Sequence, residues 1–162
     1  ADLVDRAHAA NCLVGVDADG DALKLAIERK PDLIKPNRDE VARLLGAPIG
    51  DAKDALAKAR AFYASGVRYA LISLGADGAA LCGPTGAFLG TSPTIEAVST
   101  IGAGDSLLGA FLARLVAGDA PETALQWGLA AGAATALTSG AQIGARENIE
   151  RLFSEARVER VD

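Results

Sequence analysis

The sequence has no methionine, one histidine, two cysteines and only 4% aromatic residues among its 162 positions. One histidine and two cysteines at unrelated spacing cannot supply the imidazole and thiolate ligands of a zinc-type site. Scarce aromatics, a formal net charge of -5 and the lack of a Lys/Arg cluster argue against nucleic-acid binding. Cys12 and Cys82 lie in apolar, strand-like runs. We expect both to be buried free thiols.

Long apolar segments are also lacking, since no stretch approaches the roughly 20 uninterrupted apolar residues that span a bilayer. The N-terminus has no basic-then-apolar layout of a secretion signal, so we expect a cytosolic protein without a membrane partner. Without methionine, Ala1 is not an unprocessed translation start, which processing or truncation would explain. The expected pattern opens on a helix without a leading strand, and we therefore expect upstream residues to be missing.

Apolar residues make up half of the sequence, which is ample material for the core of one compact domain. Apolar runs and turn residues predict strands at residues 12–16, 32–35, 67–74, 79–82, 87–89 and 94–98. Helical patterns cover residues 2–11, 22–30, 39–45, 52–65, 104–117, 121–137 and 146–155. Strands alternating with helices, followed by terminal helices, predict an α/β fold with a largely parallel sheet.

The segment STIGAGDS at residues 99–106 joins an expected strand to an amphipathic helix through two glycines and carries a carboxylate. Glycines let a backbone approach a phosphate closely, and the free amides at a helix N-terminus favour negative charge there. A carboxylate beside such an anion hole could accept a proton from an attacking hydroxyl, which would make Asp105 a catalytic base. The alternative is that Asp105, Ser99 or Thr100 merely caps the helix, and spacing alone favours capping.

Two further segments have a structural and a functional interpretation. Asn37 and Glu40 stand three positions apart at a helix start, where they either orient waters on a Mg²⁺ bound to ATP or form a capping box. The segment SLGADG at residues 73–78 either covers a nucleotide at a strand end or is an ordinary hairpin turn. Neither segment decides between its two interpretations alone.

Taken in this order, the three segments resemble the C-terminal half of the ribokinase (PfkB-type) carbohydrate kinase family over essentially all 162 residues. The matched motifs are KPN-x-x-E at Lys35, Pro36, Asn37 and Glu40, T/S-x-G-x-x-G at Ser73, Gly75 and Gly78, and G-A-G-D at residues 102–105. The resemblance implies a ribokinase-like three-layer α/β/α fold with a mostly parallel sheet whose N-terminal part is missing. Residues 1–162 would be the C-terminal nucleotide-binding portion of the kinase domain.

The resemblance implies ATP and Mg²⁺ as cofactors and a role for each matched residue. Asp105 would be the base that deprotonates the acceptor hydroxyl, beside an anion hole formed by Gly102, Ala103 and Gly104. Asn37 and Glu40 would hold Mg²⁺ through water. The residues implied to contact ATP are Lys35, Asn37, Ser73, Gly75, Gly78, Gly104 and Gly132. Leu129 would replace an asparagine that ribokinase-like members place near the adenine.

Within the family, the sequence most resembles the branch that contains 1-phosphofructokinase and tagatose-6-phosphate kinase. This implies ATP-dependent phosphoryl transfer to a hydroxyl of a sugar phosphate. The alternatives are a kinase for a non-phosphorylated sugar or nucleoside, an ATP- or ADP-binding fragment that is inactive alone, and a subunit whose missing half comes from a partner chain. The resemblance also allows a homodimer, because in this family the lid often forms the dimer interface.

Overall fold

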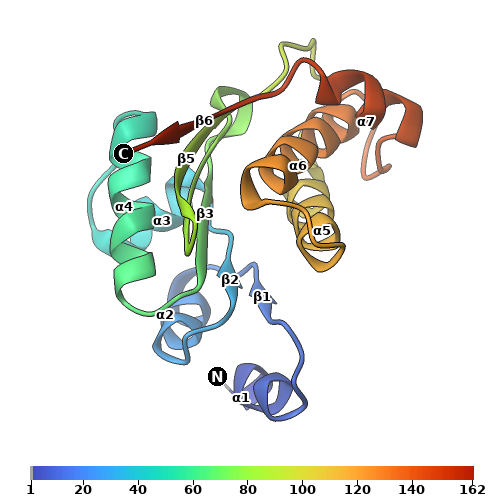
Figure 1. Ribbon diagram of the computed structural model, residues 1–162. Coiled ribbons are helices and arrows are strands. Elements are labelled where there is room, and N and C mark those ends of the chain that lie inside the picture. The colour runs from blue at the N-terminus through green and yellow to red at the C-terminus, as the bar shows by residue number, and fades with distance from the viewer. Residues whose placement is uncertain (1) are drawn as a thin grey trace. The chain divides into compact units, whose positions relative to one another are not determined.

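The computed structural model describes residues 2–162 (Figure 1). Its helices are α1 (Asp2–Ala9), α2 (Gly20–Glu28), α3 (Arg38–Leu45), α4 (Ala52–Ala64), α5 (Ala103–Val116), α6 (Pro121–Ala136) and α7 (Arg146–Phe153), with a short 3₁₀ helix η1 (Gly75–Asp77). Its strands are β1 (Gly15–Val16), β2 (Leu33–Ile34), β3 (Tyr69–Ser73), β4 (Ala79–Gly83), β5 (Gly86–Thr91) and β6 (Arg157–Val161). The strands are ordered in the sheet as they are in the chain.

The chain divides into two compact units. Unit 1 comprises the chain up to Leu74, Ala80–Ala87 and Asp162, and unit 2 comprises Gly75–Ala79 and Phe88–Val161. The division follows the packing, because α3 and α4 contact β3 whereas α5 and α7 contact α6, which also contacts β6. Each unit therefore has its own set of packed elements.

Unit 1 is built on the parallel strands β1, β2 and β3. Gly15 pairs with Leu33 and Leu33 with Tyr69, so the carboxyl ends of the three strands lie at one edge. Figure 1 shows α3 and α4 alongside β3, where they cover the buried residues of the strands. Fully buried β-strand side chains include Leu33, Ile34, Leu71 and Ile72. Polar residues that follow these strands are thereby gathered at a single edge of the sheet.

Unit 2 is dominated by α5 and α6, which lie side by side in Figure 1. Phe111 on α5 and Leu125 on α6 are completely buried, as the helical spacing of their apolar neighbours predicts. Trp127 on α6 stacks on Phe153 of α7 with ring centroids 4.4 Å apart. Small residues on α6 let the α5 backbone approach closely, and this contact fixes the position of the α5 N-terminus.

The expected helices are confirmed to within two residues at each end, and the expected parallel strands are confirmed but shorter. The strand expected at residues 94–98 is wrong, because that segment is irregular and its last residue instead donates its amide to Ala136 O at 2.8 Å. Strand β6 was not expected, because its alternating charged residues look like a solvated segment. Cys82 is buried as expected, but Cys12 is exposed because β1 begins only at Gly15.

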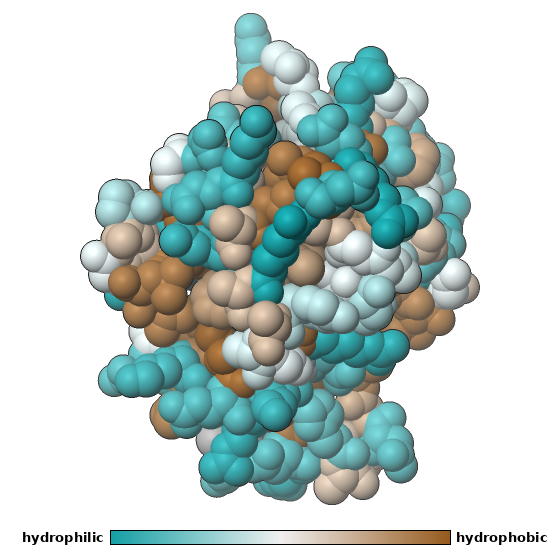
Figure 2. Space-filling view, turned by 60° about the vertical axis from the view of Figure 1, so that its left-hand side comes forward, coloured by the Kyte–Doolittle hydropathy of each residue, from teal (hydrophilic) through white to brown (hydrophobic). Residues whose placement is uncertain are grey.

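The surface carries both polar and apolar groups. On the face shown in Figure 2, apolar atoms form several separate brown areas between teal polar ones. Exposed large apolar side chains include Val98, Ile101 and Ile143 in unit 2. Within residues 2–162, no helix combines the length and the apolar character needed to cross a membrane.

Candidate active site

The N-terminus of α5 is a glycine turn. Gly102 is the N-cap residue, with φ 78 and ψ -3 in the left-handed region, which glycine adopts without steric cost. The Ala103 amide donates to Thr100 O at 3.3 Å, and the Ser106 amide opens the helical pattern by donating to Gly102 O at 2.9 Å. Helix amides and the helix dipole together favour an anion in front of such a turn.

No side chain of the described residues caps α5, so the capping interpretation of residues 99–106 is wrong. The Ser99 hydroxyl instead accepts from the Ile101 amide at 3.3 Å and donates to Gly140 O at 3.2 Å. Asp105 is exposed in the first turn of the helix, three residues after Gly102. A carboxylate at this position can accept a proton from a group bound in front of the turn.

The first turn of α5 rests on α6. A Cβ built on Gly132 would lie 3.1 Å from Ala103 O, so the α6 backbone passes directly behind the turn. Thr135, which is completely buried, donates to the Ser106 hydroxyl at 2.8 Å. The structure therefore gives Gly132 a packing contact with the turn, whereas its predicted contact with ATP stays a prediction.

Leu129 lies in the core of unit 2. Its side chain is 1% exposed, and a Cβ built on Gly90 would lie 2.5 Å from Leu129 Cδ1. Leu129 is thus a core residue packed against β5. Its apolar side chain offers no polar contact to a base, and its place near an adenine stays a prediction.

Lys35 follows β2 in unit 1 and is nearly buried. Its Nζ lies 2.9 Å from Asp17 Oδ2, with side chains 5% and 29% exposed respectively. Asp17 follows β1, the parallel neighbour of β2, and the Lys35 amide donates to Val16 O at 3.0 Å. Sequence reasoning missed Asp17. The signal was available, because residues that follow adjacent parallel strands meet at one edge of the sheet.

Asn37 and Glu40 form a complete capping box at the start of α3. The Glu40 amide donates to Asn37 Oδ1 at 2.9 Å, and the Asn37 amide donates to Glu40 Oε2 at 2.8 Å. The Asn37 Nδ2 also donates to Glu40 Oε1 at 2.8 Å. The structural interpretation is therefore confirmed. It does not exclude the other one, since each carboxylate oxygen can accept a second hydrogen bond, for example from a Mg²⁺-bound water.

The SLGADG segment connects β3 to its sheet neighbour β4 through η1, so the turn interpretation is confirmed, whereas a contact with a nucleotide stays a prediction. Ser73 ends β3 and pairs with Asn37 in a parallel bridge, and its amide donates to Pro36 O at 3.0 Å. Gly75 begins η1, and the Gly78 amide donates to Gly75 O at 3.1 Å. A Cβ added at Gly78 would overlap Gly90 O on β5. The packing of the backbone therefore requires a glycine at position 78. At Gly75, by contrast, an added Cβ would meet no atom within 4 Å.

The predicted site residues fall into two groups. Lys35, Asn37, Glu40 and Ser73 belong to unit 1, where the ends of β2 and β3 bring them together. The residues in unit 2 are Gly75, Gly78, Gly102, Ala103, Gly104, Asp105 and Gly132. Among the described residues, no cluster of three or more His, Cys, Asp or Glu side chains could hold a metal ion directly.

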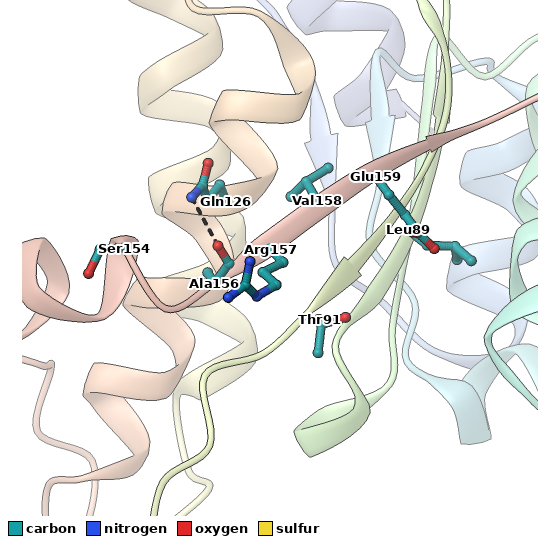
Figure 3. Close-up of a pocket in the computed structure, with 8 residues that line it drawn as sticks. All are labelled: Leu89, Thr91, Gln126, Ser154, Ala156, Arg157, Val158 and Glu159. Carbon is teal, nitrogen blue, oxygen red and sulfur yellow. Dashed lines mark hydrogen bonds between the residues drawn. The ribbon is translucent and has the colours of Figure 1, made fainter.

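A cavity of about 510 Å³ in unit 2 has none of the predicted site residues in its lining. It is lined by Leu89, Thr91, Gln126, Ser154, Ala156, Arg157, Val158 and Glu159 (Figure 3). Figure 3 shows the Gln126 amide bonded to Ala156 O, and the same nitrogen donates to Phe153 O, both at 2.9 Å. Gln126 thus ties α6 to the turn that leads into β6, which is a structural role.

Comparison with solved structures identifies the class of fold. A phosphofructokinase-like protein from Staphylococcus aureus superposes with a TM-score of 0.90 at 26% identity, covering 99% of this chain and 52% of the other. Ribokinase from Thermotoga maritima gives a TM-score of 0.67 at 30% identity, covering 79% and 43% of the two chains. The chain therefore has a ribokinase-like α/β fold, as its motifs implied.

Sequence comparison identifies the family. The model of the pfkB family of carbohydrate kinases matches residues 2–148. The 1-phosphofructokinase of Bacillus subtilis is 31% identical over 151 residues, which are 93% of this chain and 49% of that protein. The 1-phosphofructokinase of Borreliella burgdorferi is 34% identical over 145 residues, or 89% and 47% of the two chains. The chain belongs to the pfkB family and spans about half the length of these relatives.

Proposed function

We propose that this chain carries the phosphate-handling part of an ATP-dependent kinase that phosphorylates a hydroxyl of a sugar phosphate. The observation that carries the proposal is the uncapped glycine turn at the N-terminus of α5, with Asp105 exposed in its first turn. Membership of the pfkB family supports a carbohydrate acceptor. The cytosol, where ATP and sugar phosphates are available, is part of the proposal.

In the proposed reaction, Asp105 accepts the proton of the acceptor hydroxyl as that oxygen attacks the terminal phosphorus of ATP. Backbone amides of Gly102 and Gly104 donate to the oxygens of the phosphoryl group in transit, where charge gathers in the transition state, while the Ala103 amide holds the turn through Thr100 O. The new O–P bond forms as the bond to the ADP oxygen breaks. Because phosphoryl transfer depends mainly on position and charge, a rigid turn and one carboxylate are sufficient protein chemistry.

The residues of unit 1 are assigned to the rest of the nucleotide. We assign Asn37 and Glu40 to waters of the Mg²⁺ that accompanies ATP, which neutralises phosphate charge when bound. Lys35 would contribute its ammonium at the same edge of the sheet, where Asp17 fixes its position. Ser73, Gly75, Gly78 and Gly132 complete the set that we assign to ATP, and this assignment rests on the family motifs.

The acceptor is assigned by resemblance. The two relatives described above are named 1-phosphofructokinase, which supports a ketohexose phosphate as the acceptor of the complete gene product. A kinase with the same machinery but an unphosphorylated acceptor would give turnover with free sugars or nucleosides. A panel of fructose 1-phosphate, tagatose 6-phosphate, fructose and adenosine separates these substrate classes directly.

The test of the proposed function is the Asp105→Ala variant of the complete gene product that contains this chain. We expect turnover with the best acceptor to fall by about 10³-fold or more, while ATP affinity measured by calorimetry changes by less than about threefold. Asp105→Asn serves as the matched variant that keeps size and polarity, and it should be equally inactive. Near-normal turnover in either variant would refute the role of Asp105.

A second candidate applies to the chain by itself, which spans only about half of each relative. The chain alone would then bind ATP or ADP without transferring a phosphoryl group, because an acceptor must be held in line with the donor for the reaction to proceed. Calorimetry with ATP and a coupled assay on the same sample decide the matter. Binding without turnover supports this candidate, and turnover by the chain alone contradicts it.

A further inference from the structure

Thr135 is a buried polar residue that the motifs do not include. It is completely buried on α6, where its hydroxyl donates to the Ser106 hydroxyl at 2.8 Å and accepts from the Gly144 amide at 3.0 Å. Its methyl group faces the glycine turn, because a Cβ built on Gly102 would lie 3.8 Å from Thr135 Cγ2. One side chain thus contacts the N-cap residue and the first turn of α5, together with the segment before α7.

The same region makes a second connection to the turn. Ser99, which precedes the turn, donates to Gly140 O at 3.2 Å, and the Thr138 hydroxyl donates to Gln142 O at 2.6 Å. The segment between α6 and α7 is therefore folded on itself and attached to the turn at Ser99. Among Ser99, Thr135 and Thr138, Thr135 is the residue that is completely buried. Its hydrogen bonds therefore face the least competition from water.

We propose that Thr135 is a positioning residue that fixes the direction of the glycine turn, and with it Asp105, through Ser106 and Gly102. Ser106 is the residue next to Asp105, so a hydroxyl anchored on Thr135 restrains the rotation of the first helical turn. The Thr135 hydroxyl uses both of its capacities here, because its oxygen accepts from the Gly144 amide and its hydrogen is donated to Ser106. This inference rests on the proposed function only for its effect on turnover.

The same hydrogen bonds could serve a purely structural role. That role predicts different effects of mutation on stability and on the turn. Loss of a merely structural contact lowers stability throughout unit 2 but leaves the turn intact in molecules that remain folded. Loss of a positioning contact loosens residues 102–106 in the folded state. A displacement of the catalytic group by about 1 Å is enough to lower turnover by about 100-fold.

The variants are Thr135→Val, which keeps the shape and removes both hydrogen bonds, and Thr135→Ser, which keeps the hydroxyl and removes the methyl group. Ser106→Ala removes the partner hydroxyl without enlarging any side chain, and it remains informative if Thr135→Val fails to fold. Thr138→Val is the control, because the Thr138 hydroxyl bonds Thr135 O and Gln142 O rather than α5.

The first readout is hydrogen exchange of the Ala103 and Ser106 amides, which are hydrogen-bonded within the turn, measured by NMR on the chain itself under conditions where each variant is folded. We expect roughly tenfold faster exchange in Thr135→Val and Ser106→Ala, near-original exchange in Thr135→Ser, and no change in Thr138→Val. Unchanged exchange at the turn in both Thr135→Val and Ser106→Ala would overturn the proposal, whatever their effect on overall stability.

The second readout is steady-state kinetics of the complete gene product. Thr135→Val should lower kcat by about 10- to 100-fold with the KM for ATP within about threefold, and Thr135→Ser should restore most of kcat. A Thr135→Val enzyme with loosened turn amides but unchanged kcat would overturn the catalytic consequence. Failure of the proposed function would give another result. Asp105→Ala would then stay active, while Thr135→Val and Ser106→Ala would still show faster amide exchange at the turn.

Discussion

Gly128 on α6 packs directly against Leu107 on α5, since a Cβ added at Gly128 would lie 2.9 Å from Leu107 O. At this distance the two helix backbones touch without an intervening side chain. One turn further along α6, Gly132 makes the equivalent approach to Ala103 O. Close packing of two helices thus leads directly to the turn on which the proposed chemistry depends.

Gly128→Ala should destabilise unit 2 by about 1 kcal/mol, because overpacking against a backbone oxygen outweighs the better helix propensity of alanine. The matched control is Gly109→Ala on α5, an exposed helical position with no atom within 4 Å of the new Cβ. That variant should be more stable by up to about 1 kcal/mol. Urea unfolding followed by circular dichroism and by the fluorescence of Trp127, the sole tryptophan, measures both changes. Equal effects of the two variants would contradict the packing account.

Gly78→Ala should destabilise the protein by about 3 kcal/mol or more, because φ +108 is strained for alanine and the new Cβ overlaps Gly90 O. Gly75→Ala meets no atom within 4 Å and has φ +65, so about 1–2 kcal/mol of backbone strain is its only structural cost. Thermal unfolding separates the two. A Gly75→Ala variant that stays folded and loses ATP affinity would support a nucleotide contact at Gly75, and an unchanged affinity would remove Gly75 from the site.

The capping box permits a test that separates stability from metal binding. Asn37→Ala should cost about 1 kcal/mol of stability, since it removes the cap on the Glu40 amide. Glu40→Gln keeps one oxygen for the Asn37 amide but loses the bond from Asn37 Nδ2, so it should cost about 1 kcal/mol of stability. If Glu40 contacts Mg²⁺-bound water, that variant should lower the affinity for MgATP more than for metal-free ATP. An equal effect on both forms of ATP would limit Glu40 to capping.

The two cysteines should react very differently with a thiol reagent. Cys12 is exposed, whereas burial raises the pKa of the Cys82 thiol and keeps it protonated at neutral pH. A chromogenic disulfide reagent should therefore titrate one thiol rapidly in the folded chain and the second only after denaturation. Cys12→Ser should abolish the rapid phase. Rapid reaction of both thiols in the folded chain would contradict the burial of Cys82.

Much of the fold follows from the sequence, because the spacing of apolar residues predicted the helices and the apolar runs predicted the parallel strands. The misses have physical reasons. Residues 94–98 have strand-like composition, but the segment bonds to the end of α6 instead of to a strand. In β6, the charged residues of an edge strand resemble a loop, since edge strands carry charge that central strands exclude.

The motifs of the candidate site were predictable from the sequence, but the residues that hold those motifs in position were not predicted. The glycine turn and Asp105 are consecutive in the chain, so their spacing alone suggested an anion hole. Thr135 and Asp17 are distant in the chain from the residues that they contact, Ser106 and Lys35. The contact of Thr135 is set by helix packing that no local pattern marks, whereas Asp17 could have been inferred from its place after the strand next to β2.

The most direct test of the central claim is an NMR titration of the chain with ATP, with adenosine as the control ligand. If the glycine turn binds phosphate, the backbone amide signals of Gly102, Ala103 and Gly104 should shift with ATP and not with adenosine. The backbone amide signals of Arg157 and Val158, which line the cavity of Figure 3, should not shift with either ligand. Shifts elsewhere in the chain at saturating ATP, with the three turn amides unmoved, would contradict the account.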